Sequence, residues 1–268
     1  MLLFIAAALV LSEEAKHALA LTTPPQRDGK TESLMLVSTV GLTAMVTAAR
    51  GGDADDRLGS LSLSSRKMGF AYDRGLDVRV VNTFELGASE HDRKIGFHGG
   101  GSVEASGGYR FHVAETHGPF IRGGIEALIG GDSLVYQSLV ELPQAQLGYQ
   151  YIAGPSLFEV AGRSGFSIFG RSDTGDQASR HLDQVLDVGA MGTARTGPVV
   201  VTAEWSHFLA RGEGAPIDWV TIAVCGIART VALCTDVRAV SGDVYLPSQA
   251  LAASRVTQVG ITIGSSRY

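Results

Sequence analysis

The stretch KIGFHGGGSVEASGGYRFHV, residues 94–113, decides the fold because it keeps two chemically different faces apart over twenty residues. An apolar residue or glycine occupies every odd position, whereas every even position is polar, charged or glycine. Successive side chains of a β-strand point to opposite faces, so the pattern predicts one strand with an apolar and a polar face. At about 3.3 Å per residue this strand would extend about 60 Å, which suits a tilted passage through a bilayer better than a β-sandwich.

The same alternation returns repeatedly from residue 60 to the end of the chain. Two-faced segments lie at 76–88, 120–129, 144–151, 158–171, 186–193, 199–206, 220–224, 231–237 and 259–263. Short connections alternate with longer polar ones, as in barrels that have tight turns on one rim and loops on the other. We therefore predict an all-β fold, a single antiparallel up-and-down β-barrel of roughly 10 to 12 strands preceded by an export signal.

Composition excludes several other classes of protein. The 268 residues are 45% hydrophobic and only 18% charged, which is too apolar for a disordered chain and poor in charge for the surface of a soluble enzyme. The net charge of −5 and the absence of a Lys/Arg run argue against a nucleic-acid partner. The glycine-rich segments lack the helix and lysine of a phosphate-binding loop, so no cofactor is expected, and no metal either.

Two N-terminal segments are candidates for an export signal. Residues 2–11 are an apolar run too short to span a bilayer, followed by a small-residue cleavage sequence ending at Ala20. Residues 34–49 form a second apolar run, which Arg27 and Lys30 precede and small residues end. We predict an export segment at 1–49 with cleavage near Ala20 or near Ala49, a linker at 50–59 and the barrel at 60–268. The alternative for 34–49 is a membrane-anchoring helix or an additional strand.

The two cysteines have a spacing that suits a disulfide across a hairpin. If Cys225 faces Cys234, Ile227 faces Ala232 and the turn centres on residues 229–230, so the two sulfur atoms can meet across neighbouring antiparallel strands. An exported protein meets an oxidising environment that favours this bond. The alternative is two unrelated buried thiols.

The choice of a membrane depends on which face of the wall lies inside. In an outer-membrane barrel the apolar face meets lipid and the polar face lines the lumen. Glycine, serine and glutamine fill much of the polar face, as in a packed or wet interior. The predicted lumen-facing residues are Glu104, Arg110, Arg122, Glu126, Arg163 and Glu204. The alternative is a periplasmic or secreted β-sandwich or barrel with its apolar face inside, which would bind a ligand or partner.

The alternating strands and the terminal segment VTQVGITIGSSRY, residues 256–268, resemble the bacterial outer-membrane β-barrels. The resemblance implies an outer-membrane location, and outer-membrane lipid and the barrel-assembly machinery as partners. Members of that group commonly end in an aromatic residue in phase with the apolar side chains of the last strand. Here Val259, Ile261 and Ile263 are out of phase with Tyr268, and a one-residue bulge near Gly264 would restore the phase.

One segment contains residue types that can catalyse hydrolysis. EWSHF, residues 204–208, contains Ser206 beside His207 and is similar in composition to the serine and histidine segment of the lipid A deacylase barrels. Adjacent residues of a strand point to opposite faces, so this serine and histidine cannot share a proton. We therefore predict a non-enzymatic, porin-like small pore or structural wall protein, with a barrel lipid hydrolase as a remote alternative.

Overall fold

The computed structural model describes residues 33–50, 56–73, 76–91, 94–111, 113, 117–132, 135–153, 156–173, 180–210, 217–228, 231–246 and 251–267. Nearly all of them belong to twelve β-strands. The strands are β1 (Ser33–Arg50), β2 (Asp56–Asp73), β3 (Leu76–His91), β4 (Lys94–Arg110), β5 (His117–Asp132), β6 (Val135–Ala153), β7 (Ser156–Asp173), β8 (Arg180–Thr196), β9 (Val199–Ala210), β10 (Ile217–Ala228), β11 (Val231–Leu246) and β12 (Leu251–Arg267). No helix among these residues is long and apolar enough to cross a bilayer.

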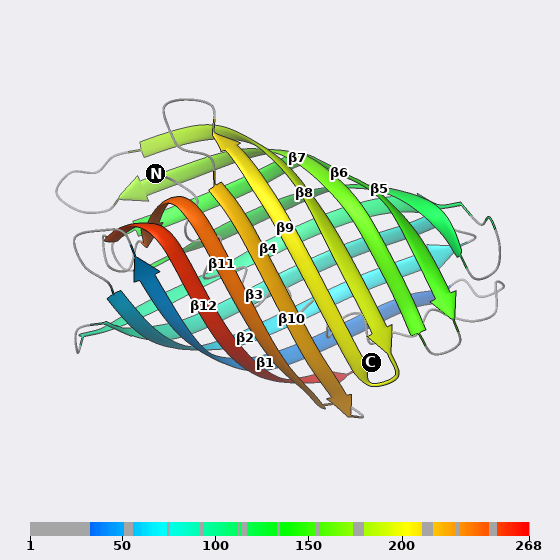
Figure 1. Ribbon diagram of the computed structural model, residues 1–268, viewed down its shortest axis with the longest axis horizontal. Helices are drawn as coiled ribbons and strands as arrows, with labels where there is room; N and C mark the ends of the chain where they lie inside the picture. The colour runs from blue at the N-terminus through cyan, green and yellow to red at the C-terminus, as the bar shows by residue number, and fades with distance from the viewer. Residues whose placement is uncertain are drawn as a thin grey trace.

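The strands form one closed antiparallel barrel in chain order (Figure 1). Each strand pairs with its neighbours in sequence, and β1 closes the wall against β12 from the pair Ser38 and Arg267 to the pair Arg50 and Arg255. Closure leaves no edge strand with unpaired backbone groups, and this is the condition that a sheet must meet inside a bilayer. The predicted single up-and-down barrel is confirmed, and its strand number lies at the upper end of the predicted range.

The N-terminal boundary differs from the predicted one. Residues 33–50 form β1, of which 38–50 pair with β12 and 33–49 pair with β2. Cleavage near Ala49 would therefore remove a wall strand. The alternative prediction for residues 34–49, an additional strand, agrees with the structure. Because β2 begins at Asp56, the barrel also begins before residue 60. Residues 1–32 and 51–55 lie outside the described residues, so an export signal ending near Ala20 stays a prediction.

The two faces of the wall have the chemistry of a membrane barrel. On β10 the outward side chains Val220, Ile222 and Val224 are exposed, whereas Thr221 and Ala223, which point inward, are buried. In the stretch that predicted the fold, Phe97 is 74% exposed and Val103 50% exposed. A water-soluble protein would bury such side chains, and a continuous apolar exterior of this kind is the surface that hydrocarbon covers.

The two rims of the barrel differ in the length of their connections. The rim at which β1 begins and β12 ends carries the connections 74–75, 111–116, 154–155, 197–198 and 229–230. The other rim carries 51–55, 92–93, 133–134, 174–179, 211–216 and 247–250. Outer-membrane barrels have short periplasmic turns and longer extracellular loops. We therefore expect the rim at which β1 begins and β12 ends to face the periplasm, and we call the other the outer rim.

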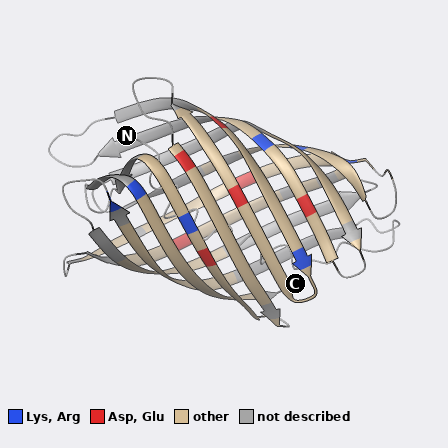
Figure 2. Ribbon diagram, viewed as in Figure 1, with Lys and Arg blue, Asp and Glu red and all other residues tan. Residues whose placement is uncertain are grey.

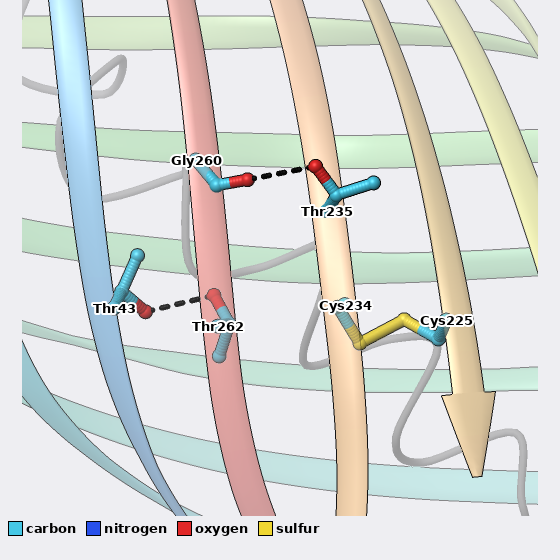
Figure 3. The surroundings of a disulfide bond; sticks show 6 residues. All are labelled: Thr43, Cys225, Cys234, Thr235, Gly260 and Thr262. Carbon is cyan, nitrogen blue, oxygen red and sulfur yellow. Dashed lines mark hydrogen bonds between the residues drawn. A yellow bond between two sulfur atoms is a disulfide. The ribbon is translucent and has the colours of Figure 1, made fainter.

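The predicted disulfide is present and faces the interior. Cys225 and Cys234 are directly paired between β10 and β11, with their sulfur atoms bonded at 2.05 Å and both residues fully buried (Figure 3). Nearby, the Thr43 and Thr262 hydroxyls lie 2.9 Å apart across the β1–β12 seam. The pairing of β12 is continuous around Gly264 on both sides, so the bulge that would restore the phase of Tyr268 is not found there. Tyr268 itself lies outside the described residues.

Candidate functional site: the barrel interior

Charged residues are sparse in the described part of the wall (Figure 2). Most of those that the sequence placed in the lumen have side chains on its inward face. Five of these residues are partly buried and lie at the alternate positions of their strands that point inward, which we call the inward parity. They are Glu104, Arg110, Arg122, Arg163 and Glu204. The Ser106 hydroxyl donates to Glu104 Oε1 at 3.3 Å. The side chain of Glu126 lies outside the described ones, and its backbone pairs with that of Glu104. Among the described residues, the charged and hydrogen-bonding side chains are therefore concentrated in the interior.

Arg163 of β7 is the centre of the first interior cluster, which also contains Asp187, Glu204 and Ser206. Its Nη1 lies 2.7 Å from Glu204 Oε1, and its Nη2 donates to Ser206 Oγ at 2.6 Å. Asp187 Oδ2 is 3.9 Å from Arg163 Nε. Glu204 and Ser206 belong to β9, so the arginine passes over β8 to reach them, at the position where Gly189 is paired with both Arg163 and Ser206. Gly189 makes this crossing possible because it has no side chain.

Arg122 of β5 is the centre of a second cluster, in which an arginine again lies near a glutamate of another strand. Its Nη1 donates to Gln146 Oε1 at 3.2 Å and lies 3.8 Å from Glu159 Oε1 on β7. Gln150 Nε2 also donates to a Glu159 oxygen at 3.1 Å. The Arg122 guanidinium lies 5.0 Å from the ring centre of Phe120, close enough for a cation–π contact. Each of the two arginines thus has a glutamate two strands away.

The arc formed by β10, β11, β12 and β1 is more tightly filled. Arg238 has no exposed surface, and its guanidinium lies 4.3 Å from the ring centre of Trp219. Arg238 Nε and Trp219 Nε1 both donate to Thr221 Oγ1, at 3.2 Å and 2.7 Å. Gln258 Nε2 donates to Thr47 Oγ1 across the β1–β12 seam at 3.1 Å. Side chains rather than open water occupy the lumen along this arc.

Several interior residues lie outside the predicted lumen-facing set. They are Glu159, Asp187, Trp219, Asp236 and Arg238. Asp236 is fully buried, and neither of its oxygens has a hydrogen-bond partner among the described residues. The signal that could have found these residues is their parity, because each alternates with exposed residues of its own strand.

The segment EWSHF divides between the two faces. Ser206 lies inside with Arg163 and Glu204, whereas His207 lies outside, with its Nδ1 2.8 Å from Asp218 Oδ1. The described part of the chain holds no group of three or more His, Cys, Asp or Glu side chains placed to ligate a metal ion.

Comparison with known proteins identifies the class of fold. No protein-family model matches the sequence, and no curated protein matches it either. Among solved structures, an outer-membrane channel from Pseudomonas putida F1 superposes with a TM-score of 0.60 at 11% identity, over 90% of this chain and 99% of that one. The translocator domain of the autotransporter NalP from Neisseria meningitidis gives a TM-score of 0.43 at 8% identity, over 98% of each chain. An anion-selective porin from Comamonas acidovorans gives 0.42 at 12% identity, over 88% of this chain and 100% of that one.

The chain has the fold of a bacterial outer-membrane β-barrel. The closed wall and its apolar exterior agree with the outer-membrane location that the sequence predicted. The alternative of an exported protein with a dry apolar centre is wrong, because the apolar side chains of the wall point outward.

Proposed function

We propose that the protein is a non-enzymatic outer-membrane channel with a narrow, eccentric passage for small polar solutes. The observation that carries the proposal is the difference between the two arcs of the lumen. Arg122, Glu159, Arg163 and Glu204 keep 11 to 21% of their side-chain surface accessible inside a closed wall. On the arc that contains Arg238 the inward side chains are almost fully buried, whereas on β4 to β9 these partly accessible side chains lie among others that are buried. The passage would therefore run along β4 to β9.

Pairing of the charges determines the selectivity that we expect. Glu204 neutralises Arg163 and Glu159 neutralises Arg122, so the passage presents no large excess of either sign. A ring of one charge is what makes a pore strongly selective for ions of the opposite charge. We therefore expect a low conductance with weak selectivity between anions and cations.

Changing one member of the Arg163–Glu204 pair should change this selectivity in opposite directions. In planar bilayers under a KCl gradient, Glu204→Gln should shift the reversal potential toward anion selectivity, because it leaves the arginine in excess. Arg163→Gln should shift it toward cation selectivity, because Glu204 and Asp187 remain. Asp218→Asn is the matched control, since Asp218 lies on the outer face and its replacement should leave the reversal potential unchanged. Failure of the wild type and of both variants to pass current would contradict the channel and favour a structural wall protein.

A lipid hydrolase is the less favoured function. The Ser206 hydroxyl contacts Arg163 and Glu204 in the lumen, and His207 lies on the other side of the wall, so this histidine cannot serve as a base for the serine. Lipid release from outer membranes on addition of the purified protein, lost in Ser206→Ala, would revive this function.

Insertion by the barrel-assembly machinery, which the terminal segment suggested, is part of the proposal of an outer-membrane channel.

A further inference from the structure

The disulfide between Cys225 and Cys234 lies in a closed part of the interior (Figure 3). Neither cysteine keeps any solvent-accessible surface. On the neighbouring strands, Cys225 is directly paired with Val200 of β9 and Cys234 with Thr262 of β12, and both of these residues are buried too. A reagent therefore reaches the two sulfur atoms only when the wall opens.

Formation of this bond needs access to the sulfur atoms. A disulfide forms when a thiolate attacks a sulfur atom of another disulfide, and the reaction passes through a mixed disulfide between the two molecules. A protein oxidant has to bring its own disulfide into contact with the cysteine, and a fully buried side chain does not allow this contact. The two thiols are thus accessible to such a partner before the barrel closes and not afterwards.

The two cysteines can meet without the rest of the wall. They are nine positions apart, and only residues 229–230 connect β10 to β11. Their direct pairing needs the register of these two strands alone. The Arg163–Glu204 contact, in comparison, needs the registers of three strands. Because the loop to be closed is short, the entropic cost of closing it is small, and the hairpin by itself can bring the thiols together.

The sequence of the connection is a weak determinant of the register of this hairpin. Two-residue hairpin turns favour glycine or asparagine, because one or both central residues have a positive φ. The connection between β8 and β9 has this feature, with Gly197 at a φ of 55°. Between β10 and β11 the two residues are Arg229 and Thr230. A slip of one residue in this hairpin would move the inward side chains of one strand to the lipid face, so another device has to select the register.

We propose that Cys225 and Cys234 are the substrate of a protein disulfide oxidant in the periplasm, which acts before the barrel closes, and that the bond sets the register of the β10–β11 hairpin. The thiolate of one cysteine attacks the oxidant's disulfide, and one thiolate of the oxidant leaves. The thiolate of the other cysteine then attacks the first cysteine's sulfur in the mixed disulfide, forms the Cys225–Cys234 bond and releases the second thiolate of the oxidant. The chain loses two electrons and two protons, and the oxidant's disulfide takes them up as a dithiol. The inference rests on export of the chain to an oxidising compartment and does not need conduction.

Oxidation of the reduced full-length chain before and after folding tests the order of events. The probe is a protein oxidant with an exposed Cys-X-X-Cys disulfide, and a gel shift after reaction with maleimide-linked polyethylene glycol measures the free thiols. The chain kept unfolded in dilute urea without detergent should be oxidised rapidly. In the same urea, the reduced chain folded in detergent should be oxidised at least about a hundredfold more slowly, because access then requires opening of the wall. A heat-modifiable band on a gel shows that this sample is folded. A reduced chain that folds only after oxidation would also support the proposal.

The outer face of the same hairpin offers a position for a matched control. Ala228 and Val231 are directly paired, and both are exposed. Val231 is also paired with Ser265 of β12. Ser265 follows the outward apolar residues that form the apolar belt on that strand, which are Val259, Ile261 and Ile263. Ala228 and Val231 therefore lie at the margin of the belt, within reach of a reagent in water.

The control chain carries Ala228→Cys with Val231→Cys, together with Cys225→Ser and Cys234→Ser. The oxidant should act on this outward pair at similar rates in the folded and the unfolded chain, which would assign the protection of the natural pair to its burial. Oxidation of the natural pair at similar rates in the folded and the unfolded chain would overturn the proposal, because the bond could then form after closure.

Folding without the bond tests its effect on the register. On refolding from urea into detergent, the Cys225→Ser with Cys234→Ser chain should fold at least roughly tenfold more slowly than the oxidised chain, because the bond no longer restricts the unfolded chain. Adding Arg229→Asn with Thr230→Gly should recover most of the rate, because this turn selects the register itself. Equal folding rates of the oxidised chain and the serine variant, or no recovery with the new turn, would overturn the role of the bond in the register.

Discussion

Replacement of Ile261 by arginine should lower the free energy of unfolding by about 2 to 4 kcal/mol in lipid vesicles. Ile261 lies near the middle of the apolar belt on β12 and is 54% exposed. If that exposed surface meets hydrocarbon, the arginine has to lose its hydration or deform the bilayer. Urea titration of the vesicle-inserted protein, followed by tryptophan fluorescence, measures the change.

Ser265→Arg is the matched control on the same strand and the same face. Ser265 lies at the margin of the belt, where the cost of an arginine falls to about 0 to 1 kcal/mol because the side chain reaches the headgroups. Values for both variants within about 0.5 kcal/mol of wild type would mean that Ile261 faces water, since substitutions at exposed surface sites usually stay within that range.

Gly189→Ala should lower the free energy of unfolding by about 1 to 3 kcal/mol. An ideal Cβ at this position would lie 2.4 Å from the Trp205 carbonyl oxygen and 3.3 Å from Arg163 Nε. The first contact is with backbone, so the wall has to shift. The second is with the side chain that crosses β8 to reach Glu204. The variant should therefore also loosen the Arg163–Glu204 pair and change the conductance in planar bilayers.

Gly192→Ala provides the comparison within β8. The nearest atom to a Cβ at Gly192 is the Glu159 carbonyl oxygen at 3.8 Å, which is an ordinary contact. This variant should be close to wild type in both stability and conductance. An equal loss of stability in the two variants would contradict the account, because it would assign the effect to a general property of β8 rather than to the crossing of Arg163 over Gly189.

Parity explains why the sequence was enough to predict the wall. On a strand, a shift of one residue moves every side chain to the other face. The sequence of an alternating segment therefore shows directly which residues share a face. Phe97 and Val103 were assigned to one face and Glu104 to the other, and the structure has them so. The pairing of Cys225 with Cys234 followed from counting residues around a hairpin, and the separation of Ser206 from His207 followed from parity alone.

The N-terminal strand was harder to recognise because its described inward side chains carry no charge, and one of them, Met45, is apolar. Gly41, Thr43 and Thr47 face the lumen, and between them Leu42, Ala44 and Val46 face outward. Glycine and threonine make little contrast with alanine and valine, so the segment reads as one apolar run and imitates a signal sequence. Strands with charged inward residues, such as β5 and β7, do not have this ambiguity.

The contacts of the interior could not be predicted from single strands. Arg163 and Glu204 lie 41 positions apart in sequence, and their contact needs the registers of β7 with β8 and of β8 with β9. It also needs a glycine at the middle position. Parity assigns a residue to the lumen, but only the relative shift of the strands determines which residues meet there.

Quenching of the two tryptophans by brominated lipids tests the central claim most directly, because the chain has one tryptophan on each face. Trp205 points outward and is 43% exposed, whereas Trp219 points inward and is 6% exposed. In vesicles of lipids brominated close to the glycerol backbone, the Trp219→Phe variant, which keeps Trp205, should lose much of its fluorescence. The Trp205→Phe variant, which keeps Trp219, should be nearly unaffected. Quenching of Trp219 with Trp205 unaffected would contradict the assignment of the apolar face to lipid and the polar face to the lumen.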